Sequence, residues 1–110
     1  MKSERHAAAL LSSMLLAACA VDAPAPDCSA SAQWRAGQAD TALDPRCSSD
    51  DARQAHTLGA ELARLRAEFD AVGLQLKSTD AASAGALTRR QRQLQIDIEA
   101  IEGVAKVQSW

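Results

Sequence analysis

The sequence is poor in aromatic residues: its 110 residues include two Trp, one Phe and no Tyr. Strands favour aromatic and β-branched side chains, so a β-sandwich or β-barrel is poorly supported. Positive charge is not in excess, because 12 Lys and Arg stand against 14 Asp and Glu. That balance argues against a protein that holds nucleic acid through phosphate contacts. A chain of this length forms one small domain at most, and an enzyme with a deep cleft of its own is not expected.

The sequence also lacks an apolar run long enough to span a membrane, which needs about 20 residues. Its longest run, Ala7–Ala18, has 12 apolar or small residues and follows a short polar start with two basic residues. This pattern is typical of a secretory signal peptide, here residues 1–18. The alternative, a buried N-terminal helix, is disfavoured because Asp22, Pro24 and Pro26 follow closely.

The end of the apolar run, Leu16-Ala17-Ala18-Cys19, resembles the lipobox of bacterial lipoproteins at all four positions. The resemblance implies cleavage before Cys19, diacylglycerol on its sulfur and an acyl chain on its new amino group. Several acyl chains anchor a protein firmly to a membrane. In that family an Asp after the cysteine is the usual signal for retention in the inner membrane. Because Ala20 stands there, the resemblance implies a lipid anchor in the outer membrane, with the chain on the periplasmic side.

After the cysteine, residues 19–27 contain two prolines among small residues and are expected to form a lipid-anchored tether. Cys28 and Cys47 follow, and export to an oxidising compartment favours a disulfide between them. Closing the segment 28–47 would stabilise the fold by roughly 3 kcal/mol in the chain-entropy model. Two free thiols are the alternative. A metal site is less expected, because no His lies between the two cysteines.

Within this segment, Ser29 is a candidate N-cap for a short helix over 30–42, which Asp44-Pro45 would end. Its Trp34 and Leu43 are expected to pack on the domain that follows. The stretch Trp34-Arg-Ala-Gly-Gln-Ala-Asp-Thr41 is similar to the W-x-x-G-x-x-D-G segment of an uncharacterised family of small proteobacterial lipoproteins. Thr41 replaces the second glycine, and the longer Tyr-rich and Cys-rich middle of that family is absent. The resemblance implies no particular activity.

Residues 48–110 carry two apolar stripes with alternating spacings of three and four, which is the pattern of coiled-coil helices. The first stripe is Ala55, Leu58, Leu62, Leu65, Phe69, Val72 and Leu76. The second is Ala84, Leu87, Gln91, Leu94, Ile98, Ile101 and Ala105. The second stripe lies one residue later than a continuation of the first, and Lys77–Asp80 between them offers a helix stop and a new cap. We therefore predict an all-α fold, in which a short disulfide-closed helix precedes an antiparallel, coiled-coil-like helical hairpin.

Two registers of this hairpin are possible. A tight turn near 77–80 would set Phe69 against Leu87 and bring Glu68 near Arg90. A longer loop through Gly85 would set Phe69 against Leu94. We favour the tight turn, because the residues from Asp80 onward are good helix formers apart from Gly85.

Residues with catalytic potential are few. His56 is the only histidine after position 19, and Asp50 and Asp51 lie near it in sequence. A solvent-edge histidine and helix-capping carboxylates explain these residues better than an active site. The sequence has no phosphate-binding glycine loop, zinc spacing or calcium-loop pattern. We therefore expect no enzymatic activity, cofactor, metal or small-molecule substrate.

One basic cluster stands out: Arg89, Arg90 and Arg92. These side chains could contact lipid phosphates, peptidoglycan carboxylates or a protein partner. They lack the interleaved aromatic residues that stack on nucleic-acid bases. The simpler interpretation is that they pair with Glu68 and Asp70 across the hairpin or face water.

Together these features predict a small outer-membrane lipoprotein that serves as a non-catalytic envelope accessory or adaptor and offers a helical surface to a partner. One alternative is a self-assembling structural coiled-coil lipoprotein in which each chain forms a longer rod. A less favoured alternative is an inhibitor or modulator of a cell-wall enzyme.

Overall fold

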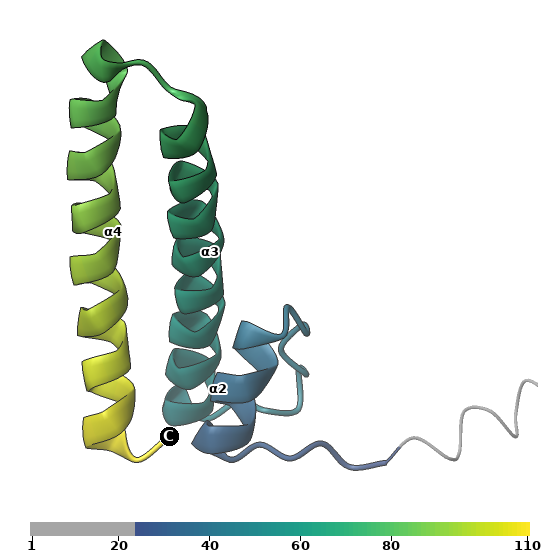
Figure 1. The fold of residues 1–110 in the computed structure, drawn as a ribbon. Helices are drawn as coiled ribbons and strands as arrows, with labels where there is room; N and C mark the ends of the chain where they lie inside the picture. Colours follow the sequence, from purple (N-terminus) through teal and green to yellow (C-terminus); the bar gives the residue numbers. More distant parts are fainter. Residues whose placement is uncertain (1–23) are drawn as a thin grey trace, which may run out of the picture.

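The computed structural model describes residues 24–110 and contains three helices and no strand within them. They are α2 (Ala30–Gln38), α3 (Asp50–Ser78) and α4 (Ala81–Gln108). Figure 1 shows α3 and α4 as two long helices side by side, with the short α2 beside the N-terminal part of α3. The prediction of an all-helical protein is confirmed for this part of the chain. The predicted signal peptide and Cys19 lie outside the described residues.

Helix α2 begins as predicted and ends earlier than predicted. The Ser29 side chain accepts a hydrogen bond from the Ala32 backbone N–H at 3.2 Å and caps the helix. The prediction that this helix reaches Ala42 is wrong, because α2 stops at Gln38. Asp40 adopts a left-handed backbone with φ of 57°, and the Thr41 N–H then bonds back to the Ala36 carbonyl at 2.9 Å. Asp tolerates this conformation better than most residues, so the chain turns out of the helix here.

Polar caps also set the start of both long helices. Ser49 accepts a hydrogen bond from the Ala52 N–H at 3.2 Å, and Asp50 and Asp51 occupy the first turn of α3, where the helix dipole favours acidic groups. Asp80 accepts a hydrogen bond from the Ser83 N–H at 2.9 Å and caps α4. The connection between the helices is therefore Thr79 and Asp80, within the break that the sequence predicts.

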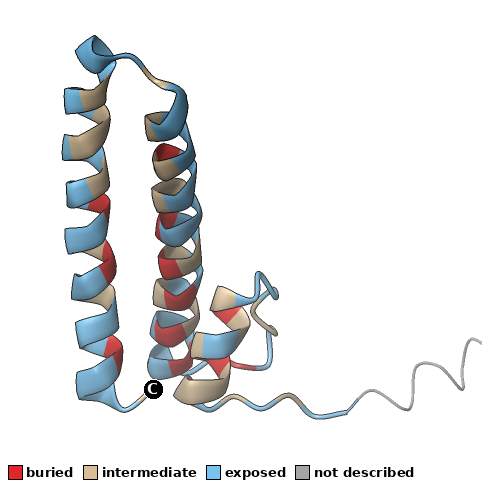
Figure 2. Ribbon diagram, in the orientation of Figure 1, coloured by how far each residue is buried: buried red, intermediate tan, exposed pale blue. Residues whose placement is uncertain are grey.

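The main core lies between α3 and α4. Every position of the two apolar stripes is buried or half-buried, and Figure 2 shows the buried residues on the facing sides of the two helices. The buried members of this core are Leu62, Leu65, Val72, Leu94 and Ile98. Glu68 and Arg90 form an ion pair between the helices, which is the contact expected of the short connection and not of the longer loop.

Helix α2 crosses α3 at very short distance. A Cβ atom on Gly37 would lie 2.2 Å from the His56 carbonyl oxygen, and one on Gly59 would lie 2.4 Å from the Trp34 carbonyl oxygen. The two backbones therefore touch where a side chain would otherwise separate them. Trp34 packs against the main core, and its ring lies 5.5 Å from that of Trp110. The last residue of the chain thus covers α2 at the end of the molecule that contains the disulfide.

Candidate interaction surface

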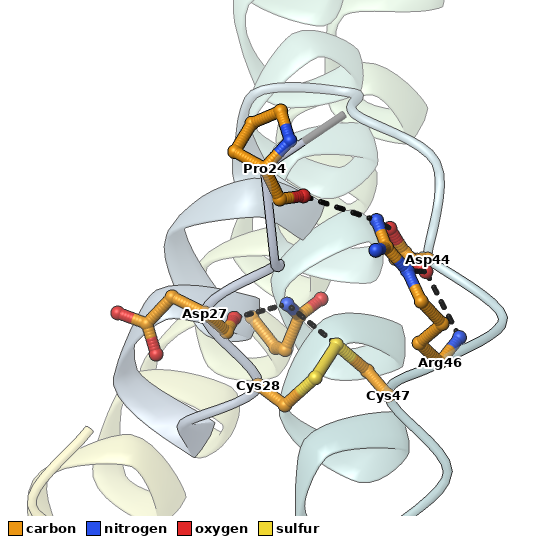
Figure 3. Close-up of polar contacts among 7 residues, drawn as sticks. Pro24, Asp27, Cys28, Asp44, Arg46 and Cys47 are labelled. Carbon is orange, nitrogen blue, oxygen red and sulfur yellow. Dashed lines mark hydrogen bonds and ion pairs between the residues drawn. A yellow bond between two sulfur atoms is a disulfide. The ribbon is translucent and has the colours of Figure 1, made fainter. Parts of the chain in front are cut away.

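A disulfide closes the base of the molecule, the end at which α2 and the N-terminus of α3 meet. Cys28 and Cys47 are joined, with an S–S distance of 2.09 Å and Cα atoms 5.1 Å apart, as predicted (Figure 3). Cys47 is buried, and it lies three residues before Asp50, the first residue of α3. The start of the α2 segment is thereby tied covalently to the start of α3.

Two side chains tie the segment Pro24–Asp27 to this base (Figure 3). The Arg46 guanidinium donates to the Pro24 carbonyl at 3.4 Å, and the Gln33 amide donates to the Asp27 carbonyl at 2.8 Å. The same Gln33 amide lies 3.6 Å from the Cys47 sulfur. Pro24 and Asp27, at the end of the predicted tether, therefore contact the folded body.

Two carboxylates at the base, the half-buried Asp44 and the exposed Asp27, are held in their charged form by hydrogen bonds. The Arg46 side chain, and then its backbone N–H, lower the pKa of Asp44. The backbone N–H of Ser29 at 3.0 Å lowers the pKa of Asp27. Each bond stabilises the carboxylate relative to the neutral acid. Gln33 has a different environment: it is buried, and its Oε1 accepts no hydrogen bond from residues 24–110.

His56 has a structural contact. Its Nε2 lies 2.6 Å from the Thr41 carbonyl oxygen, so the nitrogen is the donor, and the contact links α3 to the turn after α2. This contact gives His56 a structural role between α3 and the turn after α2. Within the described residues, no group of three or more His, Cys, Asp and Glu side chains could hold a metal ion.

The three arginines of the basic cluster have different environments along α4. Arg90 is paired with Glu68 of α3. Arg89 and Arg92 are exposed, and neither forms an ion pair with another residue in the range 24–110. The structure therefore assigns Arg90 to the contact between the helices and leaves Arg89 and Arg92 available on the surface.

A groove lies near the far end of the two long helices, which we call the tip groove. Its lining is Phe69, Asp70, Gly73, Leu74, Leu76, Lys77 and Gln91. Gly73 leaves space beside Gln91, whose amide nitrogen would be 3.4 Å from a Cβ atom at that position. Leu74, on one wall, is 65% exposed. The groove is thus mostly apolar, with one acidic and one basic residue in its lining.

The sequence pattern did not reveal this groove. Leu74 lies outside the predicted stripe, and an isolated exposed leucine on a helix surface is common. A signal was present in Gly73, since a glycine inside a helix is unfavourable and often has a packing reason.

None of the helices in the described part of the chain is long and apolar enough to cross a membrane. Comparisons of the chain with models of protein families, with curated proteins and with solved structures find no significant match. The resemblances to the lipobox and to the W-x-x-G-x-x-D-G segment therefore rest on the quoted residues themselves.

Proposed function

We propose that this chain is a small outer-membrane lipoprotein that acts as a non-catalytic adaptor in the cell envelope. In this proposal Cys19 carries the lipid and the chain is on the periplasmic side. Helices α3 and α4 form an antiparallel, coiled-coil-like hairpin that presents its far end to a protein partner. The lipobox at Leu16–Cys19 supports the anchor, and the tip groove supports the partner.

The observation that carries the adaptor role is the apolar tip groove near the α3–α4 connection, whose lining includes Leu74. This side chain is 65% exposed on the wall of the tip groove. The groove lies near the α3–α4 connection, at the opposite end of the long helices from Pro24, where the described chain begins (Figure 1). Helix α3 has 29 residues and is therefore about 43 Å long. A membrane anchor before Pro24 would leave this apolar groove accessible to another protein.

The partner is tested by crosslinking in living cells. A photoreactive amino acid replaces Lys77 in the groove lining, and in a separate strain it replaces Thr57, which is exposed nearer the base. We expect position 77 to capture one recurrent envelope protein and position 57 not to capture it. Leu74→Gln should reduce the capture at least tenfold, because partner binding would bury this side chain.

The matched control is Ala71→Gln, which places the same side chain at another exposed position of α3 outside the groove. Capture should persist in this variant. Loss of capture in both variants, or equal capture at positions 57 and 77, would contradict a specific site at the tip.

The anchor is tested separately by intact mass analysis of the mature protein and by membrane fractionation. We expect a chain that begins at a triacylated Cys19, with Cys28 and Cys47 oxidised. Cys19→Ser should move the protein out of the membrane fraction. A protein that keeps Met1 and carries no lipid would exclude the anchor without affecting the test of the tip groove.

A further inference from the structure

Helix α4 carries a second apolar stripe on its outer side. Ile96 is 58% exposed, Val104 39% and Val107 82%. Ala100 and Gly103 are also exposed, and a Cβ atom on Gly103 would meet nothing within 4 Å. A shallow groove, lined mainly by apolar residues, runs over Ala100, Gly103, Val104 and Val107 and reaches Gln108. We call these five residues, Ile96, Ala100, Gly103, Val104 and Val107, the outer face of α4.

The outer face repeats the pattern of the core with a shift of two residues. The core positions Leu94, Ile98, Ile101 and Ala105 are spaced by four, three and four residues. The outer positions Ile96, Ala100, Gly103 and Val107 have the same spacing, two residues later. Two residues correspond to about 200° around an α-helix, so the second stripe lies opposite the first. Figure 2 shows the side of α4 that faces away from α3 as exposed along its length. The helix therefore has a packed seam and an unpartnered seam.

We infer that the outer face of α4 binds the same face of a second copy of this chain, with the two helices antiparallel. A two-fold axis near the middle of the stripe would set Ile96 of each copy against Val107 of the other. The same axis would set Ala100 of each copy against Gly103 of the other, where these small residues permit close approach of the helices.

The charges beside the outer face fit this arrangement. Glu99 and Lys106 are exposed and lie on the same flank of the stripe, because seven residues complete almost two helical turns. Antiparallel coiled helices bring equivalent flanks together. The proposed axis therefore places Glu99 of each copy beside Lys106 of the other, which gives two symmetric opposite-charge pairs. Within residues 24–110, no ion pair occupies Lys106 in the single chain.

The contact would be small. From Ile96 to Val107 the helix rises only about 16 Å. One face of so short a segment offers less surface than the roughly 800 Å² that each partner of a stable dimer usually buries. We therefore expect a dissociation constant of micromolar order or weaker in solution.

The inference is tested on the full chain by sedimentation equilibrium over a range of concentrations. We expect reversible dimers. Ile96→Glu should raise the dissociation constant at least tenfold, because the interface would then contain four carboxylates, those of position 96 and Glu99 in each copy. Ala71→Glu is the matched control, since it adds the same charge at an exposed position of α3 outside both the outer face and the tip groove, and dimerisation should persist. Circular dichroism should show that both variants remain helical. A monomer at every concentration, or an unchanged dimer in Ile96→Glu, would overturn the inference.

Zero-length carbodiimide crosslinking tests the orientation. An equimolar mixture of ¹⁴N-labelled and ¹⁵N-labelled full chains should yield an amide between Glu99 and Lys106 that joins a light chain to a heavy one. Within one helix these residues are about 10 Å apart along the axis, too far for a bond without a spacer. Lys106→Gln should abolish the link. Mixed-isotope links that exclude this pair would show a different interface.

The dimer and the tip groove fail independently. The tip groove can bind a partner in a monomeric chain, and the pairing of α4 requires neither that partner nor a lipid on Cys19. Loss of capture at position 77 with an intact dimer would reject the proposed adaptor role alone. Monomers that still capture the partner would reject the dimer alone.

Discussion

At the residue scale, two glycines determine how closely α2 approaches α3. Gly37 lies against the His56 carbonyl and Gly59 against the Trp34 carbonyl. Each position lies inside a helix, where glycine is less stable than alanine by about 0.5–1 kcal/mol. The packing of α2 against α3 that these glycines permit therefore offsets the lower helix stability of glycine at both positions.

We predict that Gly59→Ala destabilises the protein by about 1–3 kcal/mol, because the added methyl group would overlap the Trp34 carbonyl and force the helices apart. Urea unfolding followed by circular dichroism measures the change. Gly85→Ala is the control: its Cβ atom would lie 3.7 Å from the Arg89 guanidinium, and alanine should stabilise α4 by about 0.5–1 kcal/mol. Equal stabilisation by both substitutions would show that the two backbones are not in contact.

The sequence identified several individual roles and missed others. The Cys28–Cys47 pairing follows from the export signal and the two remaining cysteines. The Glu68–Arg90 contact follows from the tight turn, which the helix-forming residues after Asp80 favour over the longer loop. The Gly37 and Gly59 contacts do not, since periodicity describes one helix and contains no information about a crossing with another. The role of Leu74 was missed for a related reason: the groove that it lines also includes Gln91 of α4, and the pattern of one helix does not show which residues of the other lie beside it.

At the scale of the elements, helix boundaries follow local polar chemistry. Ser29, Ser49 and Asp80 each cap a helix through a side-chain oxygen, and serine and aspartate are preferred at that position. The early end of α2 was not predictable from Asp44-Pro45, because the chain turns at Asp40 through a left-handed backbone.

Loss of the Asp80 cap tests the connection between α3 and α4. We predict that Asp80→Ala lowers the free energy of unfolding by about 1 kcal/mol, because the Ser83 N–H loses its acceptor at the start of α4. Ser78→Ala is a suitable control, since its hydroxyl is exposed and bonds only to the Gln75 carbonyl of its own helix. It should change stability by less than about 0.5 kcal/mol. Similar losses in both variants would argue against a capping role for Asp80.

The second stripe of α4 shows how one helix can carry two patterns. The core seam was recognisable from its large apolar residues, Leu94, Ile98 and Ile101. The outer seam contains Ala100 and Gly103, which contribute little hydrophobic signal to a sequence pattern. Its regular spacing becomes informative once the structure shows that α3 packs on the opposite side.

At the scale of the whole molecule, the disulfide and α2 assemble the base from distant parts of the chain. Trp34 of α2 meets Trp110 at the end of the chain, and Arg66 of α3 contacts both Gln38 of α2 and Glu102 of α4. The sequence predicted each helix and the disulfide, but it could not place α2 against α3 or Trp34 against Trp110, because these contacts join residues far apart in sequence.

We predict that the double variant Cys28→Ser, Cys47→Ser loses roughly 3 kcal/mol of stability, because the unfolded chain is no longer constrained by the closed segment. The segment 24–47 should lose protection from hydrogen exchange, whereas α3 and α4 keep their mutual core. Urea unfolding and exchange measured by mass spectrometry report the two effects. Reduction of the wild-type protein is the matched comparison, and unchanged protection of α2 in both samples would show that its packing does not depend on the disulfide.

The position of the disulfide also determines how the protein carries mechanical load. A pull on the N-terminal segment passes from Cys28 through the sulfur atoms to Cys47, and from there into α3, so tension bypasses α2. The bridge spans 19 positions of the chain with Cα atoms 5.1 Å apart. Without it, the same pull would peel α2 away and release roughly 60 Å of extended chain. The bond therefore makes the link between the segment before Cys28 and the long helices short and inextensible, and it shields the crossing of α2 and α3 from force.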